Sequence, residues 1–195
     1  VPNMEVALLV DRSGSMYGDN IYYAMKAAAM IFYFAQIVGI KISVYSHCVN
    51  DHDQVDLISY SDPDAIDGND GKRIFSMEDD CDGCNRDGFA LRFALNRLAE
   101  SDADQKIMII ISDGCPNDTG YGFGEAQIDV QGAVAEARKK HGILTVTAAI
   151  GDDCEAIRRM YCDGISEKNA AKVMDISDLE KLPRIFVNIL KKSLK

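Results

Sequence analysis

Val6-Ala-Leu-Leu-Val10 is an unbroken apolar run that leads directly into Asp11-Arg-Ser13-Gly-Ser15, a group of oxygen-bearing side chains. The run is too short for a helix and lacks polar alternation, which predicts a strand buried on both faces. A second run of this kind, Ile107–Ile111, leads into Ser112-Asp113-Gly114. Strands buried on both faces are typical of parallel sheets covered by helices, so the two runs predict an α/β protein.

Helix and strand patterns alternate through the rest of the chain. Helices are predicted over 21–38 (with Asp19 or Asn20 as N-cap), 88–100, 127–141, 155–161 and 179–194, and further strands over 42–45, 55–60, 144–150 and 173–176. This alternation predicts a doubly wound, mostly parallel six-stranded sheet with helices on both faces, in the order 3-2-1-4-5-6. We expect one antiparallel edge strand, and 55–60 fits an edge position because its polar and apolar residues alternate. The Asp- and Gly-rich segment 61–87 is predicted to be a long loop with one short helix.

The composition is that of a globular protein, with 47% apolar and 27% charged residues among 195. The first strand begins so early that we expect residues 1–195 to be a single domain cut from a longer chain. The 21 Lys and Arg residues face 31 Asp and Glu residues, a net charge of −10 that disfavours a nucleic-acid partner. The apolar stretch 24–40 contains Lys26 and Gln36, so we interpret it as a buried helix and expect no membrane span.

The six cysteines are too few for a disulfide framework in a chain of this length. We expect free thiols and a cytoplasmic location, since no charged and then apolar leader opens the sequence. Cys81-Asp-Gly-Cys84 is a single C-x-x-C pair, too few ligands for zinc. Together with Cys115 it leaves open a soft-metal or redox site. His47, Cys48 and His52 are predicted to lie in a surface loop.

Asp11, Ser13 and Ser15 are candidate metal ligands at the carboxyl edge of the sheet, where open α/β folds bind ligands. The alternative is a helix start with Ser13 as N-cap. In the predicted strand order the strands ending at Asp11 and Asp113 are neighbours, so the two carboxylates should face each other. They would repel unless a cation lies between them or one is protonated. Hard oxygen donors favour Mg²⁺, with Mn²⁺ or Ca²⁺ as alternatives.

A third segment at this edge is Asn85-Arg-Asp87, which opens the helix before the fourth strand. Asn85 or Asp87 could add a further oxygen ligand, although Asp87 also suits the N-cap of that helix. The sequence contains neither a GxxxxGK[ST] nor a GxGxxG phosphate loop, and no Ser-His-Asp nucleophile set is evident. We therefore expect a binding module rather than an enzyme.

Asp11-x-Ser13-x-Ser15, a middle-loop ligand and Asp113-Gly114, in this order, resemble the metal-ion-dependent adhesion site of von Willebrand factor A domains. The resemblance covers essentially the whole chain. Within that family the sequence is similar to the C-terminal domains of nitric oxide reductase activation protein D and of the cobalt chelatase T subunit. This narrower resemblance is carried by Asn85-x-Asp87-Gly-x-Ala90-Leu-Arg92, Arg97-Leu98, Ser112-Asp113-Gly-x-Pro116-Asn117-Asp118, Asp129, Ala133-Val134-x-Glu136-Ala137-Arg138 and Leu182-Pro183. Many members have Thr where this chain has Asn85, so the choice between Asn85 and Asp87 stays open.

The resemblance implies a module that binds one divalent cation and leaves a coordination position for an acidic side chain of a partner protein. The implied ligands are Asp11, Ser13, Ser15 and Asp113, with Asn85 or Asp87. It further implies a cytoplasmic accessory protein that acts with a MoxR-class AAA+ ATPase in metal insertion or metalloenzyme activation. One alternative is a Mg²⁺-dependent phosphohydrolase, which needs a second Asp where this chain has Ser13. The other is a secreted adhesion domain, which expects a leader and disulfides.

Overall fold

The computed structural model describes residues 3–114, 116, 118–150, 154–163, 166, 170–175 and 187–188. The predicted helix over 179–194 lies outside these residues except for 187–188, and so do Cys115, Asn117 and Leu182-Pro183.

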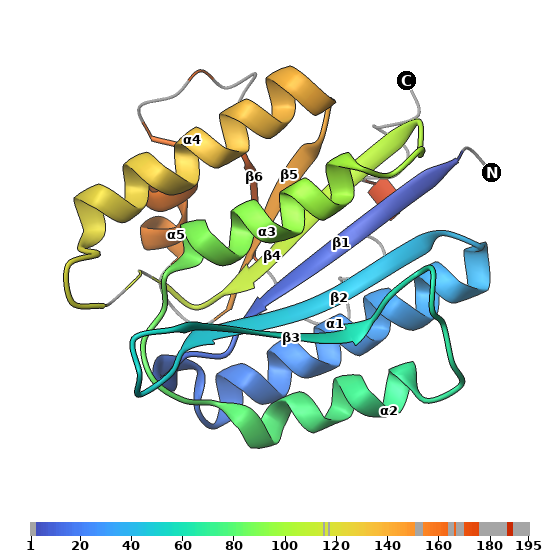
Figure 1. The fold of residues 1–195 in the computed structure, drawn as a ribbon, viewed down its shortest axis with the longest axis horizontal. Coiled ribbons are helices and arrows are strands. Elements are labelled where there is room, and N and C mark those ends of the chain that lie inside the picture. The colour runs from blue at the N-terminus through green and yellow to red at the C-terminus, as the bar shows by residue number, and fades with distance from the viewer. Residues whose placement is uncertain are drawn as a thin grey trace.

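The sheet has six strands in the order β3-β2-β1-β4-β5-β6, which confirms the doubly wound α/β fold expected from the sequence (Figure 1). The strands are β1 (Met4–Asp11), β2 (Lys41–Val49), β3 (Val55–Ser61), β4 (Gln105–Ser112), β5 (Leu144–Ala149) and β6 (Lys172–Asp175). All neighbouring pairs are parallel except β2 and β3, so β3 is the antiparallel edge strand.

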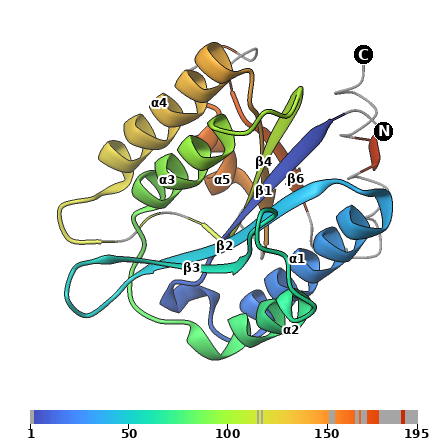
Figure 2. The ribbon, with the colours of Figure 1, turned by 45° about the vertical axis from the view of Figure 1, so that its right-hand side comes forward.

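Helices cover both faces of this sheet (Figure 2). They are α1 (Asp19–Val38), α2 (Asp70–Phe75), α3 (Asp87–Ala99), α4 (Phe123–His141) and α5 (Cys154–Tyr161), with short 3₁₀ helices η1 (Gly14–Met16) and η2 (Ser76–Asp80). Helices α1 and α2 pack on one face, and α3, α4 and α5 on the other. Helix α4 begins at Phe123 rather than Gln127, because buried Ala126 extends its apolar face by one turn.

Both faces of the sheet are covered by helices, which explains why polar and apolar residues do not alternate along the apolar runs. Val6, Leu8 and Val10 of β1 pack toward α1, while Ala7 and Leu9 pack toward α3 and α4. Each large aliphatic side chain buried in this way contributes about 1.5–3 kcal/mol of transfer free energy. A strand that is buried on both faces holds its register firmly, and this fixes where the strand ends and its polar residues begin.

Helix α1 is the one helix of the described residues that is long and apolar enough to cross a membrane. Half of its most apolar window is nevertheless buried inside the protein. Ala24, Ala27 and Ala28 on its inner face have no exposed surface, and their small size lets the helix lie close to the sheet. This is the environment of the buried core helix expected from the sequence.

Strand β2 is longer than predicted, and this corrects the expected surface loop at His47 and Cys48. Both residues lie inside the strand and are buried. The extension arises because β3 turns back along β2 and pairs Leu57 with His47 and Asp56 with Cys48. Only His52, in the turn between the two strands, is exposed as expected.

The segment 61–87 also differs from the single short helix expected. It forms α2 followed directly by η2, and Ile74 and Met77 of these helices are buried against α1. Their apolar side chains are too few for a helical period to show in so acidic a segment.

Candidate metal centre

The carboxylate of Asp11 lies where β1 ends and has no exposed surface. Its Oδ1 accepts a hydrogen bond from the backbone N–H of Ser13 at 2.8 Å. Its Oδ2 accepts one from Ser112 Oγ at 3.1 Å and one from Asn85 Nδ2 at 2.9 Å. The partners come from three separate segments: the loop after β1, the end of β4 and the loop before α3. Asp11 therefore joins the three segments that the sequence analysis placed at one edge.

The two serines and Asp113 form a chain of polar contacts on the open side of Asp11. Ser13 Oγ and Ser15 Oγ lie 3.2 Å apart, and Ser15 Oγ donates to Asp113 Oδ1 at 3.1 Å. Ser13 is the N-cap residue of η1, as the alternative interpretation expected, but its hydroxyl makes no capping hydrogen bond. A pocket of about 210 Å³ opens here; its lining is Ser13, Ser15, Gly83, Cys84, Asn85, Asp113 and Gly114.

Asn85 and Asp87 occupy different places. Asn85 lines the pocket, whereas Asp87 does not. Asp87 is buried behind it, and among the described residues neither of its carboxylate oxygens accepts a well-formed hydrogen bond, although the Tyr161 hydroxyl interacts with this carboxylate. His47 Nε2 lies 3.6 Å from Asp87 Oδ1. The N-cap interpretation of Asp87 is wrong: Arg86 is the N-cap residue of α3, and Asp87 is the first residue of the helix.

The carboxylates of this edge repel one another electrostatically. Burial raises the pKa of Asp87 well above its usual range, and the charges of Asp11 and Asp113 raise it further. Burial and the charge of Asp11 also raise the pKa of Asp113, although the hydrogen bonds from Ser15 and Asn20 oppose that shift. Arg12, the cationic residue within the Asp-x-Ser-x-Ser loop, reaches toward Asp56, with Nη2 3.3 Å from Oδ2. An added cation would relieve this repulsion.

The donor set fits a hard cation only if neutral oxygens take part. Within the described part of the chain, no group of three or more His, Cys, Asp and Glu residues is arranged to hold a metal ion. At this pocket Asp113 would therefore have to act with the hydroxyls of Ser13 and Ser15 and with the amide of Asn85. Oxygen donors of this kind suit Mg²⁺ and do not suit softer metals.

The sequence profile of the von Willebrand factor type A domain matches residues 5–186. The chain belongs to this family. The uncharacterized protein YojO of Bacillus subtilis (strain 168) is 30% identical over 124 residues, which is 64% of this chain and 18% of that protein. The chain thus spans less than a fifth of this relative's length.

Solved structures with the same fold include the protein BatB of Bacteroides thetaiotaomicron, with a TM-score of 0.70, 15% identity and coverage of 98% of this chain and 100% of that one. The PilB minor pilin of Streptococcus sanguinis has a TM-score of 0.68 at 17% identity, covering 98% of this chain and 61% of the pilin. The von Willebrand domain of the pilus tip protein Mfa5 of Porphyromonas gingivalis has a TM-score of 0.65 at 16% identity, covering 99% of this chain and 96% of that domain. At such identities the likeness establishes the fold alone.

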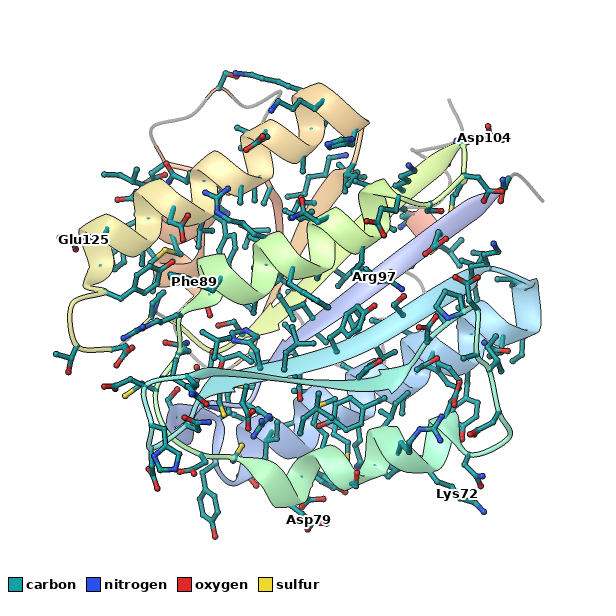
Figure 3. All side chains as sticks on the ribbon, in the orientation of Figure 1. Lys72, Asp79, Phe89, Arg97, Asp104 and Glu125 are labelled. Atoms are coloured by element: carbon teal, nitrogen blue, oxygen red, sulfur yellow. The ribbon has the colours of Figure 1, made fainter. Side chains whose placement is uncertain are left out.

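In this von Willebrand factor A domain, a network between α3 and α4 holds the start of α3 in place. The Tyr121 hydroxyl accepts a hydrogen bond from the backbone N–H of Gly88 at 3.1 Å and donates to Asp129 Oδ2 at 2.9 Å. Arg92 Nε donates to Asp129 Oδ1 at 2.9 Å. The ring of Phe89, labelled in Figure 3, meets the ring of Tyr121 edge-on at 6.0 Å. Several residues of the narrower resemblance thus position the loop that carries Asn85.

The roles of two side chains near this pocket, Asn20 and Tyr161, were not predicted from the sequence. Asn20 was expected as a possible helix cap, but its Nδ2 donates to Asp113 Oδ2 at 3.2 Å, while Gly18 is the N-cap residue of α1. The Tyr161 hydroxyl at the end of α5 is buried near Asp87, and burial and the charge of Asp87 raise its pKa. No signal in the sequence pointed to Tyr161, because its place depends on how α5 packs.

Proposed function

We propose that this domain binds one divalent cation, most favourably Mg²⁺, in the pocket beside Asp11 and Asp113, as in a metal-ion-dependent adhesion site, and uses it to hold a partner protein. The observation that carries the proposal is the convergence of three loops, after β1, before α3 and after β4, on one pocket lined by Asp113, whose pKa burial and the charge of Asp11 raise. Mn²⁺ and Ca²⁺ are also hard enough to take this place.

Some residues at the pocket would bind the cation, and others position the binding residues. Four residues that line the pocket would supply oxygen ligands to the cation: Ser13, Ser15, Asp113 and Asn85. Asp11, which is fully buried, orients Asn85 and Ser13 through its hydrogen bonds and adds negative charge. We assign the middle-loop ligand to Asn85 rather than Asp87, because Asp87 lies behind the pocket. A bound divalent cation would supply an electrophilic position that an acidic side chain of the partner completes.

The proposed partner is a MoxR-class AAA+ ATPase or its client, in the cytoplasm. The support is the narrower resemblance in the sequence, together with contacts that give several of its residues a structural role, such as Arg92 with Asp129. The net charge of −10 would repel an acidic partner at long range, so a local cation is needed for such a partner to dock. An extracellular adhesion domain would use the same pocket, and identification of the partner separates the two roles.

Calorimetric titration with Mn²⁺ or Mg²⁺ tests the cation site. The parent and Asp104→Asn should bind, whereas Asp113→Asn should not. Asp104 is an exposed residue at the opposite end of the sheet (Figure 3), so its substitution makes the same change of charge away from the pocket. Equal binding by Asp113→Asn and Asp104→Asn would show that the cation is held elsewhere or that its binding is nonspecific.

A further inference from the structure

The loop Cys81-Asp-Gly-Cys84 lies directly against the loop that follows β1. The backbone N–H of Asp82 donates to the carbonyl of Arg12 at 3.1 Å. The backbone N–H of Gly14 donates in return to the carbonyl of Gly83 at 2.9 Å. These bonds flank Ser13, so the position of its hydroxyl depends on the shape of the cysteine loop.

The same loop is fixed on its other side to the end of β2. Cys84 and Val49 exchange backbone hydrogen bonds in both directions, at 2.7 and 3.3 Å. Gly83 has a φ of 61°, and a Cβ atom there would lie 1.8 Å from the Val49 carbonyl oxygen. Little freedom is left in this turn, and Asn85 follows it immediately in the pocket wall.

The two thiols of the loop are free and differ in their surroundings. Cys84 lines the pocket, which is open to solvent. Cys81 packs against the core cluster beneath α1 and does not line the pocket. Their spacing of two residues is the one at which redox-active cysteines pair in C-x-x-C motifs. Cys84 is therefore the thiol that a dissolved oxidant meets first. Burial and the charge of Asp11 raise the pKa of Cys81 to about 11, so attack by Cys81 is the slower step.

We propose that Cys81 and Cys84 form a reversible disulfide that weakens cation binding in the pocket, an inference that rests on the proposed cation site. The oxidant is a low-molecular-weight disulfide. Cys84 sulfur attacks one of its sulfurs, forms a mixed disulfide and releases one small thiol, which takes the Cys84 proton. Cys81 sulfur then displaces the second small thiol, which takes the Cys81 proton. Two cysteines are oxidised and one disulfide is reduced to two thiols.

The effect on the cation follows from the contacts of the loop. Because the loop is held tightly in the reduced protein, closing the disulfide would strain these contacts and shift Asn85, the next residue in the chain. It also displaces the Gly83 carbonyl, which receives the N–H of Gly14. Loss of groups that orient metal ligands costs about 10–100-fold in affinity, and we expect a loss of about tenfold.

The experiment compares the reduced protein with protein treated with oxidised glutathione. Peptide mass spectrometry should show a bond between Cys81 and Cys84 with the loss of two hydrogens. Calorimetry should show a Kd for Mn²⁺ about tenfold higher, which dithiothreitol restores. Cys81→Ser should bind Mn²⁺ like the reduced parent before treatment. After treatment, the molecules that intact-protein mass spectrometry shows to carry no glutathione adduct should also bind Mn²⁺ like the reduced parent. Cys162→Ser, which removes a thiol in the turn after α5, should respond to oxidation like the parent.

The outcomes separate the two proposals. Equal Mn²⁺ affinity of the reduced and oxidised parent overturns the redox inference and leaves the cation site standing. A disulfide between other cysteines, or none under these conditions, overturns it as well. A reduced parent that fails to bind Mn²⁺ or Mg²⁺ overturns the proposed function, and the redox inference falls with it.

Discussion

Asn85 Nδ2 donates a hydrogen bond of 2.9 Å to Asp11 Oδ2 and so joins the loop before α3 to the end of β1, 74 residues earlier in the chain. The bond is buried and one of its partners is a carboxylate, so it is stronger than a bond between neutral groups. The bond directs the amide nitrogen of Asn85 toward Asp11. A cation binds oxygen and not an N–H group, so a cation in the pocket would use the amide oxygen of Asn85.

Asp11→Ala should abolish cation binding and also destabilise the fold. The substitution removes the acceptor of three buried donors, on Ser13, Ser112 and Asn85. Each buried donor left unpaired costs about 1–3 kcal/mol, partly offset by relief of the repulsion on Asp113. We expect a net loss of about 2–4 kcal/mol in urea unfolding. The exposed control Asp104→Ala should change the unfolding free energy little, and a parent-like stability of Asp11→Ala would contradict the buried network.

Asp113→Asn should behave differently, losing the cation while keeping the fold. Asp113 is only partly buried, and its raised pKa means that the folded protein disfavours its charge. Removing that charge should leave the melting temperature of the metal-free protein unchanged or slightly higher. Added Mg²⁺ should raise the melting temperature of the parent and leave that of the variant unchanged. Thermal melts of both proteins with and without Mg²⁺ provide the measurement.

Asp87 should make the metal-free protein less stable as the pH rises. Its pKa is raised in the folded state, so the folded protein holds the proton more tightly than the unfolded chain. The stabilisation is complete below about pH 4, the usual range of an aspartate, and is lost as the pH rises toward the folded pKa. Burial lowers the pKa of His47, which acts in the opposite direction, since that stabilisation is lost as the pH falls below about 6.5.

Urea unfolding between about pH 4 and pH 8 separates the two groups. Asp87→Asn should flatten the loss of stability with rising pH, and His47→Gln should remove the opposing loss on acidification. An unchanged pH profile in Asp87→Asn would show that its carboxyl is compensated in the folded protein.

Gly83→Ala should be far more damaging than Gly120→Ala. Both glycines have positive φ, 61° and 75°, so both variants carry the backbone strain of about 1–3 kcal/mol. A Cβ at Gly83 would also meet the Val49 carbonyl oxygen, whereas a Cβ at Gly120 meets nothing within 4 Å. The difference between the two unfolding free energies therefore measures how tightly the cysteine loop is held. Equal losses would mean that the loop is free to move away from β2.

The sequence was sufficient to predict the strand order and the meeting of the loops after β1 and β4. Apolar runs such as Ile107–Ile111 are so distinct that the strand ends follow directly from them. The burial of Asp87 and His47 could not be predicted from the sequence, because it depends on how far β3 extends β2 and on where α5 packs. The role of Asn20 was missed for a related reason. An Asn near the start of a helix is usually interpreted as an N-cap, and its contact with Asp113 arises only from the tertiary structure.

Association with the proposed partner should require the divalent cation. If an acidic side chain of the partner completes the coordination, a pull-down with the MoxR-class ATPase or its client should succeed with Mg²⁺ and fail with EDTA. Asp113→Ala should fail in both conditions, and Asp104→Ala should behave as the parent. Because the net charge is −10, added salt should strengthen the association if the partner's face is acidic and weaken it if that face is basic. Equal recovery with and without EDTA would leave the cation only a structural role in holding the three loops together.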